Sequence, residues 1–314
     1  MCPFCGLQNL ELMSWIPPEL KIEHANNQKP ISTPPTTEQM RTYCQKAAND
    51  CNFKLDNLVV EDNYEDGVME TLQPEDNFHN VTIRFNPKRL TRFTQQELMA
   101  LARHEIMHPV TMGEKSCILI QNGAPEYVEL QFRFSEAYDE MINYKMYVQV
   151  FPNDPHLRSY KDKEFTNYAI IFLSVKHMIQ QNRLPNPLHP HINNLAIYQD
   201  AVYFFYENKN KLKEWVKKYQ GQAIWKFWNW IHEDFNLIHD NVKSRDEMRD
   251  LIPIVIQMTL NVNPEPIFSS NMISFTENAY ERILSYKNNI KNQTGKKIVE
   301  SWERRFNEQP YIFN

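Results

Sequence analysis

Apolar residues recur at helical spacing along most of the chain and alternate at strand spacing only in its first third. The alternation is clearest in the segment Val81–Asn86, where apolar and polar residues exchange at every position before Pro87 ends the run. A further extended segment is predicted over Phe53–Glu61. Helical spacing is found over Thr37–Cys51, Pro125 to about Phe151, Tyr168–Ile179, Ala196–Tyr206, Leu212–Leu237, Leu251–Leu260 and Met272–Tyr286. The pattern predicts an α+β fold that is predominantly helical, with the short strands in the N-terminal half and a helical C-terminal half.

Prolines mark the beginning of the chain as irregular. Pro17-Pro18 and Pro34-Pro35 interrupt a polar stretch that is rich in Asn, Gln and Thr, where no regular element is expected. We therefore predict an irregular segment over residues 1–37, an α+β domain over 38–151 and a helical domain or subdomain over 152–314.

Composition narrows the classes of protein to consider. A hydrophobic fraction of 42% and an aromatic fraction of 12% are typical of a chain that buries a sizeable core. With a net charge of −5, the chain has no excess of basic residues with which to bind nucleic acid. No apolar run reaches the ~18 residues of a membrane-spanning helix. An odd number of cysteines, five, and a first segment without a secretory pattern favour an intracellular, cytoplasmic protein.

One motif carries specific chemistry. Thr94-Gln95-Gln96-Glu97 is a capping box that predicts the start of a helix, and His104-Glu105-Ile106-Met107-His108 follows within that helix. Histidines at i and i+4 lie on one helix face, where both imidazoles can reach one metal ion. Zinc in such a site lowers the pKa of a water molecule, and the adjacent glutamate accepts its proton. The motif therefore predicts a zinc hydrolase with His104 and His108 as ligands and Glu105 as the general base.

The segment Leu98–His108 resembles the active-site helix of the zincin metallopeptidases, over roughly residues 80–150 of this chain and specifically only at the HExxH motif. The resemblance implies Zn²⁺ as the cofactor and a peptide or protein as the substrate. Net charge and hydropathy already predict no nucleic acid and no membrane as partner. In that family an antiparallel edge strand before the helix holds extended substrate by strand addition. We therefore expect Val81–Asn86 to be that edge strand.

The third metal ligand decides the subfamily. Metzincins would need Gly at position 111 and His or Asp at 114, where this chain has Thr111 and Glu114. Gluzincins take a glutamate from a second helix, often with an acidic residue four positions later. Glu136 fits as that ligand, with Glu140 supporting a histidine from outside the ligand set.

Helical geometry offers Asp139 as the competing third ligand. Glu136 falls with Glu129, Arg133 and Glu140 on one polar stripe, which is typical of a solvated face. Asp139 falls on the otherwise apolar side, where a lone carboxylate is costly unless it is paired or binds metal. The segment Ala137-x-Asp139-x-x-Ile142-Asn143 is similar to one in some bacterial and archaeal metallopeptidases, where the aspartate is the presumed ligand. Asp139 is therefore favoured over Glu136, and both stay open as gluzincin-like or aspzincin-like alternatives.

Other segments have less specific chemistry. Cys2 and Cys5 form a CPxCG sequence like one knuckle of a zinc ribbon, which would need two further ligands for a structural metal. The tryptophan-rich segment Trp225–Trp230 is interpreted as core, and His232-Glu233-Asp234 as a polar helix face. A donor that stabilises an oxyanion can be sought among Tyr138, Tyr144, His177, His232 and Arg103.

Two other functions remain as alternatives to the peptidase. One is a non-catalytic zinc-binding scaffold or interaction protein, against which Glu105 argues because a structural site needs four ligands and no base. The other is a zinc hydrolase of a non-peptide amide or ester, whose motif chemistry is the same.

Overall fold

The computed structural model describes residues 30–65, 67–72, 77–112, 125–152, 154–156, 222–242, 244–263 and 273–308. Contacts divide the chain into two compact units. Of the described residues, the N-terminal unit holds 30–112 and 142–156, and the C-terminal unit holds 125–141 and 222–308. The predicted fold class is confirmed: the chain is mostly helical, with a small mixed sheet in its N-terminal half.

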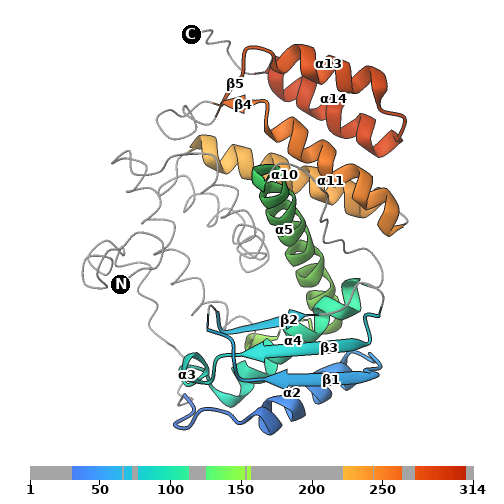
Figure 1. Ribbon diagram of the computed structural model, residues 1–314. Coiled ribbons are helices and arrows are strands. Elements are labelled where there is room, and N and C mark those ends of the chain that lie inside the picture. The colour runs from blue at the N-terminus through green and yellow to red at the C-terminus, as the bar shows by residue number, and fades with distance from the viewer. Residues whose placement is uncertain are drawn as a thin grey trace, which may run out of the picture. The chain divides into compact units, whose positions relative to one another are not determined.

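The sheet of the N-terminal unit has three strands in the order β1-β3-β2 (Figure 1). β1 (Asn57–Glu61) pairs parallel to β3 (Asn80–Phe85), and β2 (Met69–Leu72) pairs antiparallel to β3 on its other side. The expectation that Val81–Asn86 is an edge strand is therefore wrong, because β3 is the central strand. The antiparallel strand at the edge of this sheet is β2, which is four residues long and was not predicted.

Three helices belong to the first part of the same unit. They are α2 (Thr37–Asp50), the short α3 (Pro87–Leu90) and α4 (Gln95–Met112). α2 begins at a capping box, in which Thr36 and Gln39 each accept the other's backbone N–H. Cys51 is its C-cap, and Asn52 then takes a positive φ of 53°. The predicted helix over Thr37–Cys51 is confirmed.

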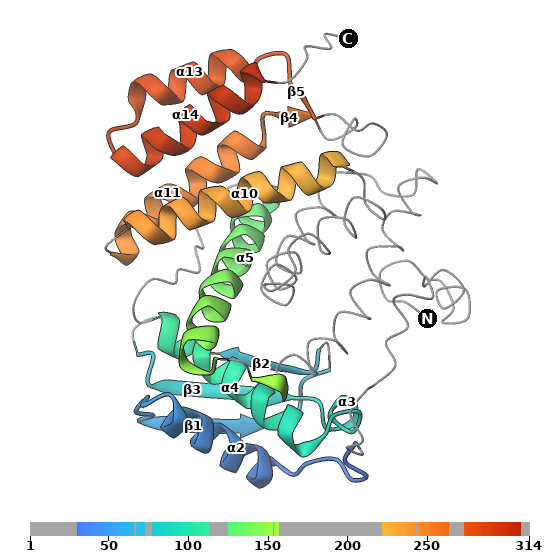
Figure 2. The ribbon, with the colours of Figure 1, turned by 180° about the vertical axis from the view of Figure 1, so that it is seen from behind.

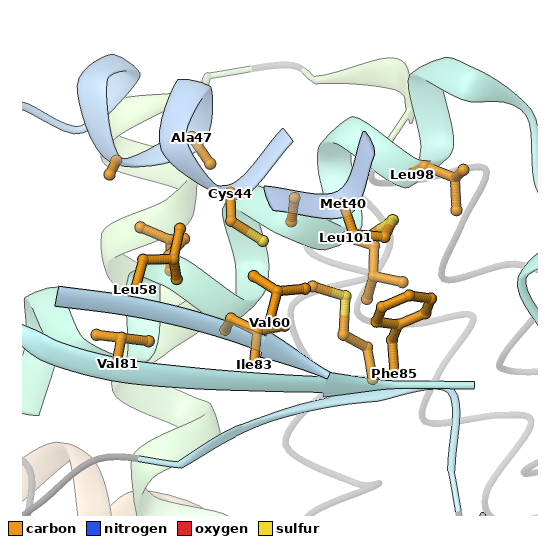
Figure 3. Close-up of a cluster of buried hydrophobic side chains, with 14 of the residues drawn as sticks. Met40, Cys44, Ala47, Leu58, Val60, Val81, Ile83, Phe85, Leu98 and Leu101 are labelled. Carbon is orange, nitrogen blue, oxygen red and sulfur yellow. The ribbon is translucent and has the colours of Figure 1, made fainter. Parts of the chain in front are cut away.

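The core of the N-terminal unit lies between these helices and one face of the sheet (Figures 2 and 3). Met40 and Cys44 of α2 and Leu101 of α4 pack with Ile83 and Phe85 of β3, and all five side chains are buried. Alternation in β3 explains this packing, since every second side chain turns toward the helices. Each large apolar side chain buried there contributes roughly 1.5–3 kcal/mol to folding. The core thus holds α4 firmly against the sheet.

The long helix α5 (Pro125–Val150) contributes to both units, because their boundary falls after Met141. Pro125 is its first residue, as the sequence predicted. The rest of the described C-terminal unit comprises α10 (Gln222–Asn241), α11 (Arg245–Thr259), β4 (Val262–Asn263), β5 (Ser274–Phe275), α13 (Ala279–Asn289) and α14 (Gln293–Asn307). Helix α14 was not predicted from the sequence pattern. The predicted helices Tyr168–Ile179 and Ala196–Tyr206 lie outside the described residues.

A buried ion pair joins α10 to α14 in the C-terminal unit. Asp234, only 1% exposed, accepts from Trp302 Nε1 at 2.6 Å and from Arg305 Nη1 at 3.0 Å. Burial raises the pKa of Asp234 to about 6, against the opposing effect of the Arg305 charge. Phe227 and Trp228 are also fully buried, which confirms the core interpretation of this tryptophan-rich stretch at those two positions. Of the polar face predicted over His232-Glu233-Asp234, Glu233 is exposed, whereas Asp234 is a buried connection between two helices.

Within the described parts of the chain, no helix is both long and apolar enough to cross a bilayer.

Candidate metal centre

α4 begins where the sequence predicted and carries the HExxH motif. The Glu97 backbone N–H donates to Thr94 Oγ1 at 3.2 Å, and the Thr94 backbone N–H donates to Glu97 Oε2 at 2.7 Å. This capping box sets the register of the helix. His104 and His108 then lie one turn apart with ring centroids at 5.0 Å and planes crossing at 78°. His104 and Glu105 are both buried, which places the motif inside the protein rather than on a solvated helix face.

The structure brings one carboxylate of α5 to these histidines. Ligand atoms of His104, His108 and Glu140 all lie within 4.8 Å of one another. Two imidazole nitrogens and a carboxylate oxygen are a donor set that suits Zn²⁺, and three protein ligands are typical of sites that keep a position open. The group can therefore hold a metal ion.

The two residues predicted as third ligand lie outside this group. Asp139 is buried at 7% exposure, as expected of the apolar side, whereas Glu136 is half-exposed and accepts from Arg133 Nη1 at 3.2 Å. Glu140 was expected only to support a histidine, yet it is the carboxylate that the structure brings to the ligand set. Successive side chains on a helix are rotated by about 100° about its axis, so Asp139 and Glu140 leave α5 in different directions.

The face of α5 that follows Glu140 explains why this carboxylate is selected. Asn143 Nδ2 donates to the backbone oxygen of His104 at 3.2 Å, and the Tyr144 ring lies 5.2 Å from the His104 ring. Asn143 and Tyr144 are three and four positions after Glu140, and therefore share its helix face. The spacing Glu140-x-x-Asn143-Tyr144 is a signal that the sequence contained. It could be recognised only once the contact with His104 was known.

The oxyanion candidates are separated by their contacts. The Tyr138 hydroxyl donates to Met248 Sδ at 3.1 Å, and the Arg103 guanidinium donates to Asp50. These two side chains therefore have hydrogen-bond partners outside the group of His104, His108 and Glu140. Tyr144 is buried against a histidine of the metal centre. His232 lies on α10, and His177 lies outside the described residues, as do Cys2 and Cys5.

Arg103 connects the motif helix to α2 and to the segment that follows α5. Its guanidinium donates to Asp50 of α2 at 2.8 Å and to Asp154 at 3.2 Å, and lies over the Phe151 ring at 4.5 Å. Burial would raise the pKa of Asp50, but hydrogen bonds from Arg103 and Lys46 outweigh it and lower that pKa. The network fixes α4 one residue before the first histidine.

Edge strand β2 reaches Glu105, the residue that the motif predicts as general base. Thr71 Oγ1 lies 2.9 Å from both the backbone oxygen and Oε2 of Glu105. Thr71 pairs in register with Ile83, whose side chain is buried beneath the helices, so Thr71 also faces α4. Sequence reasoning did not identify this residue, because 34 positions separate the two partners and β2 itself was not predicted.

No protein-family model, no curated protein and no solved structure matches this chain. The interpretation of the metal centre therefore rests on its residues and their geometry.

Proposed function

We propose that this chain is a zinc-dependent peptidase in which His104, His108 and Glu140 hold the ion and Glu105 is the general base. The observation that supports the proposal is the convergence of three ligand atoms within 4.8 Å, beside a buried glutamate that directly follows the first histidine. A purely structural zinc site has four protein ligands, whereas this group has three and a neighbouring acid.

The roles of the residues follow from their positions. A bound Zn²⁺ would lower the pKa of a water molecule and polarise the carbonyl that the water attacks. Glu105 accepts the proton of that water and later donates it to the leaving amine. Tyr144, packed against His104, is the proposed donor to the oxygen on which negative charge develops.

A peptide substrate is favoured by the position of β2. The order β1-β3-β2 leaves one side of β2 unpaired within the described sheet, and Thr71 of this strand contacts Glu105. An extended peptide added to that side would form main-chain hydrogen bonds close to the general base. A small ester has no backbone that could pair with β2, so the unpaired side of this strand favours a peptide substrate.

The ligand set is tested by metal analysis of the purified wild type beside Glu140→Gln, Asp139→Asn and Glu136→Gln. We expect stoichiometric zinc in the wild type, retention in Asp139→Asn and Glu136→Gln, and loss in Glu140→Gln. Each of the three variants removes one negative charge from α5, so they are matched controls for one another. Zinc that is lost in Asp139→Asn and kept in Glu140→Gln would transfer the third ligand to Asp139.

The reaction is tested on the same samples with casein, beside a panel of small amides and esters. Glu105→Gln should keep its zinc and lose hydrolysis by about 10²–10⁴-fold, because general-base catalysis contributes that much. Cleavage of esters without cleavage of casein would replace the peptidase with a non-peptide hydrolase. A wild type that binds no zinc even after reconstitution would refute the metal centre.

A further inference from the structure

A proline in the motif helix changes the hydrogen bonding of the general base. Pro109 lies inside α4, and a proline has no backbone N–H to donate. In an α-helix the N–H of position 109 would bond the backbone oxygen of position 105, which here belongs to Glu105. The Thr71 hydroxyl, from the neighbouring strand β2, lies 2.9 Å from that same oxygen. A side chain outside the helix thus occupies the position of the missing helical donor.

The same hydroxyl also reaches the carboxylate of that residue. Thr71 Oγ1 lies 2.9 Å from Glu105 Oε2, so one threonine contacts both the main chain and the side chain of Glu105. Glu105 is 5% exposed, and a hydrogen bond to a buried carboxylate is stronger than one in water. These contacts fix the position of one carboxylate oxygen relative to the helix backbone.

We propose that Thr71 is a positioning residue that orients the Glu105 carboxylate for proton transfer, and that Pro109 directs the Glu105 backbone oxygen to it. This inference rests on the proposed function of Glu105 as the general base. It adds a role for β2, because the strand that would pair with the peptide also holds the base.

A hydroxyl is suited to this role because it can donate and accept. While the carboxylate is ionised, the Thr71 proton is donated to Oε2. Once Glu105 has taken a proton from water, Thr71 can accept from the carboxyl group and donate to the backbone oxygen instead. Rotation of one O–H bond is then sufficient, and no heavy atom has to move. Serine has the same capacity, and valine has none despite its similar shape.

The first experiment compares Thr71→Val with Thr71→Ser by steady-state kinetics and zinc analysis. We expect Thr71→Val to lower kcat by about 100-fold with little change in KM or zinc content, the loss typical of a misplaced catalytic group. Thr71→Ser should recover most of kcat. Thr82→Val is the matched control, since Thr82 of β3 alternates with the inward Ile83 and so faces away from the helices. Equal kcat in Thr71→Val and wild type would overturn the proposal.

A second variant separates orientation of the carboxylate from simple satisfaction of the backbone oxygen. Pro109→Ala restores the N–H that can bond the Glu105 oxygen within the helix. If Thr71 served only that oxygen, Pro109→Ala would restore kcat in the Thr71→Val background. We expect the double variant to stay as slow as Thr71→Val, because the carboxylate still lacks the Thr71 hydroxyl. Recovery of kcat in the double variant would therefore overturn the positioning role.

Crystal structures of the metal-free wild type, Thr71→Val and Thr71→Ser provide a readout that needs no activity. The Glu105 carboxylate should be displaced or disordered in Thr71→Val and keep its position in Thr71→Ser. An unmoved carboxylate in Thr71→Val would refute the inference even if the chain is a peptidase. A displaced carboxylate in a chain that hydrolyses nothing would support the positioning role and refute the peptidase, so the two failures are distinguishable.

Discussion

The two units each bury a helical carboxylate, but they surround it differently. Asp234 of the C-terminal unit accepts hydrogen bonds from the indole of Trp302 and the guanidinium of Arg305. Glu105 of the N-terminal unit lies directly beside His104, a residue of the group that gathers three metal-ligating atoms. Asp234 is held by a cation and a donor and connects two helices, whereas Glu105 lies next to a group of side chains that could hold a metal ion. The comparison teaches that burial alone does not mark a functional acid, and that its partners do.

The comparison is tested most strongly by removing the acid of the C-terminal unit. Asp234→Ala should lower the free energy of unfolding by about 3 kcal/mol, because it leaves the Arg305 charge buried without its buried carboxylate. Zinc content and hydrolysis per folded molecule should not change. Urea denaturation followed by tryptophan fluorescence measures the first quantity, and metal analysis the second.

Glu233→Ala is the control for that change. Glu233 is exposed and bonds the same guanidinium at 2.9 Å, so its loss should cost less than about 1 kcal/mol. A loss of zinc in Asp234→Ala with unchanged stability would reverse the roles assigned to the two acids.

Metal removal should affect stability only through the ligand set. With free zinc at about 100 times its dissociation constant, the wild type should be stabilised by about 2.7 kcal/mol, and chelation should remove that gain. Glu140→Gln should show no such difference between zinc and chelator in thermal denaturation. An equal zinc shift in both proteins would place the bound ion outside the group of His104, His108 and Glu140.

Local signals in the sequence predicted the parts of the site that depend on neighbouring residues. The Thr94–Glu97 capping box, the two histidines one turn apart and the proline that begins α5 all act within a few residues of one another, and the structure contains each of them. Which carboxylate of α5 meets the histidines depends on the rotation of that helix, which no local pattern determines. Helical periodicity correctly predicted that Asp139 is buried, but burial does not specify where its side chain points.

The strand β2 and its threonine could not be predicted for a related reason. Met69-Glu70-Thr71-Leu72 is too short for a clear alternation, and it becomes a strand through its pairing with β3. Thr71 then meets Glu105 only because α4 packs on the same face of the sheet. Contacts of this kind depend on the assembled tertiary structure rather than on the propensity of any segment.

Acid should weaken the attachment of α4 to α2 through Asp50. The pKa of Asp50 is lowered from 3.8 in the folded protein, so its contribution is present above that value and lost as the pH falls through the folded pKa. The contribution should be at most about 1 kcal/mol, because the pair is partly exposed. Asp50→Asn should therefore lower stability at neutral pH and flatten the loss of stability below pH 3.8, as measured by denaturation across pH. An unchanged pH profile would exclude Asp50 from the attachment.

The smallest effect is expected for Glu136→Gln, which tests whether the polar stripe of α5 is only a solvated surface. Glu136 is half-exposed and pairs with Arg133 three positions earlier, an arrangement worth about 0.2–0.5 kcal/mol. Its removal should change stability by no more than that and leave zinc affinity within error, as measured by denaturation and by competition with a chelator. Glu140 lies on the same stripe but is close to the two histidines. A large loss of zinc affinity in Glu136→Gln would mean that exposure and ion pairing do not exclude a ligand role, and that the criterion separating the acids of this helix is wrong.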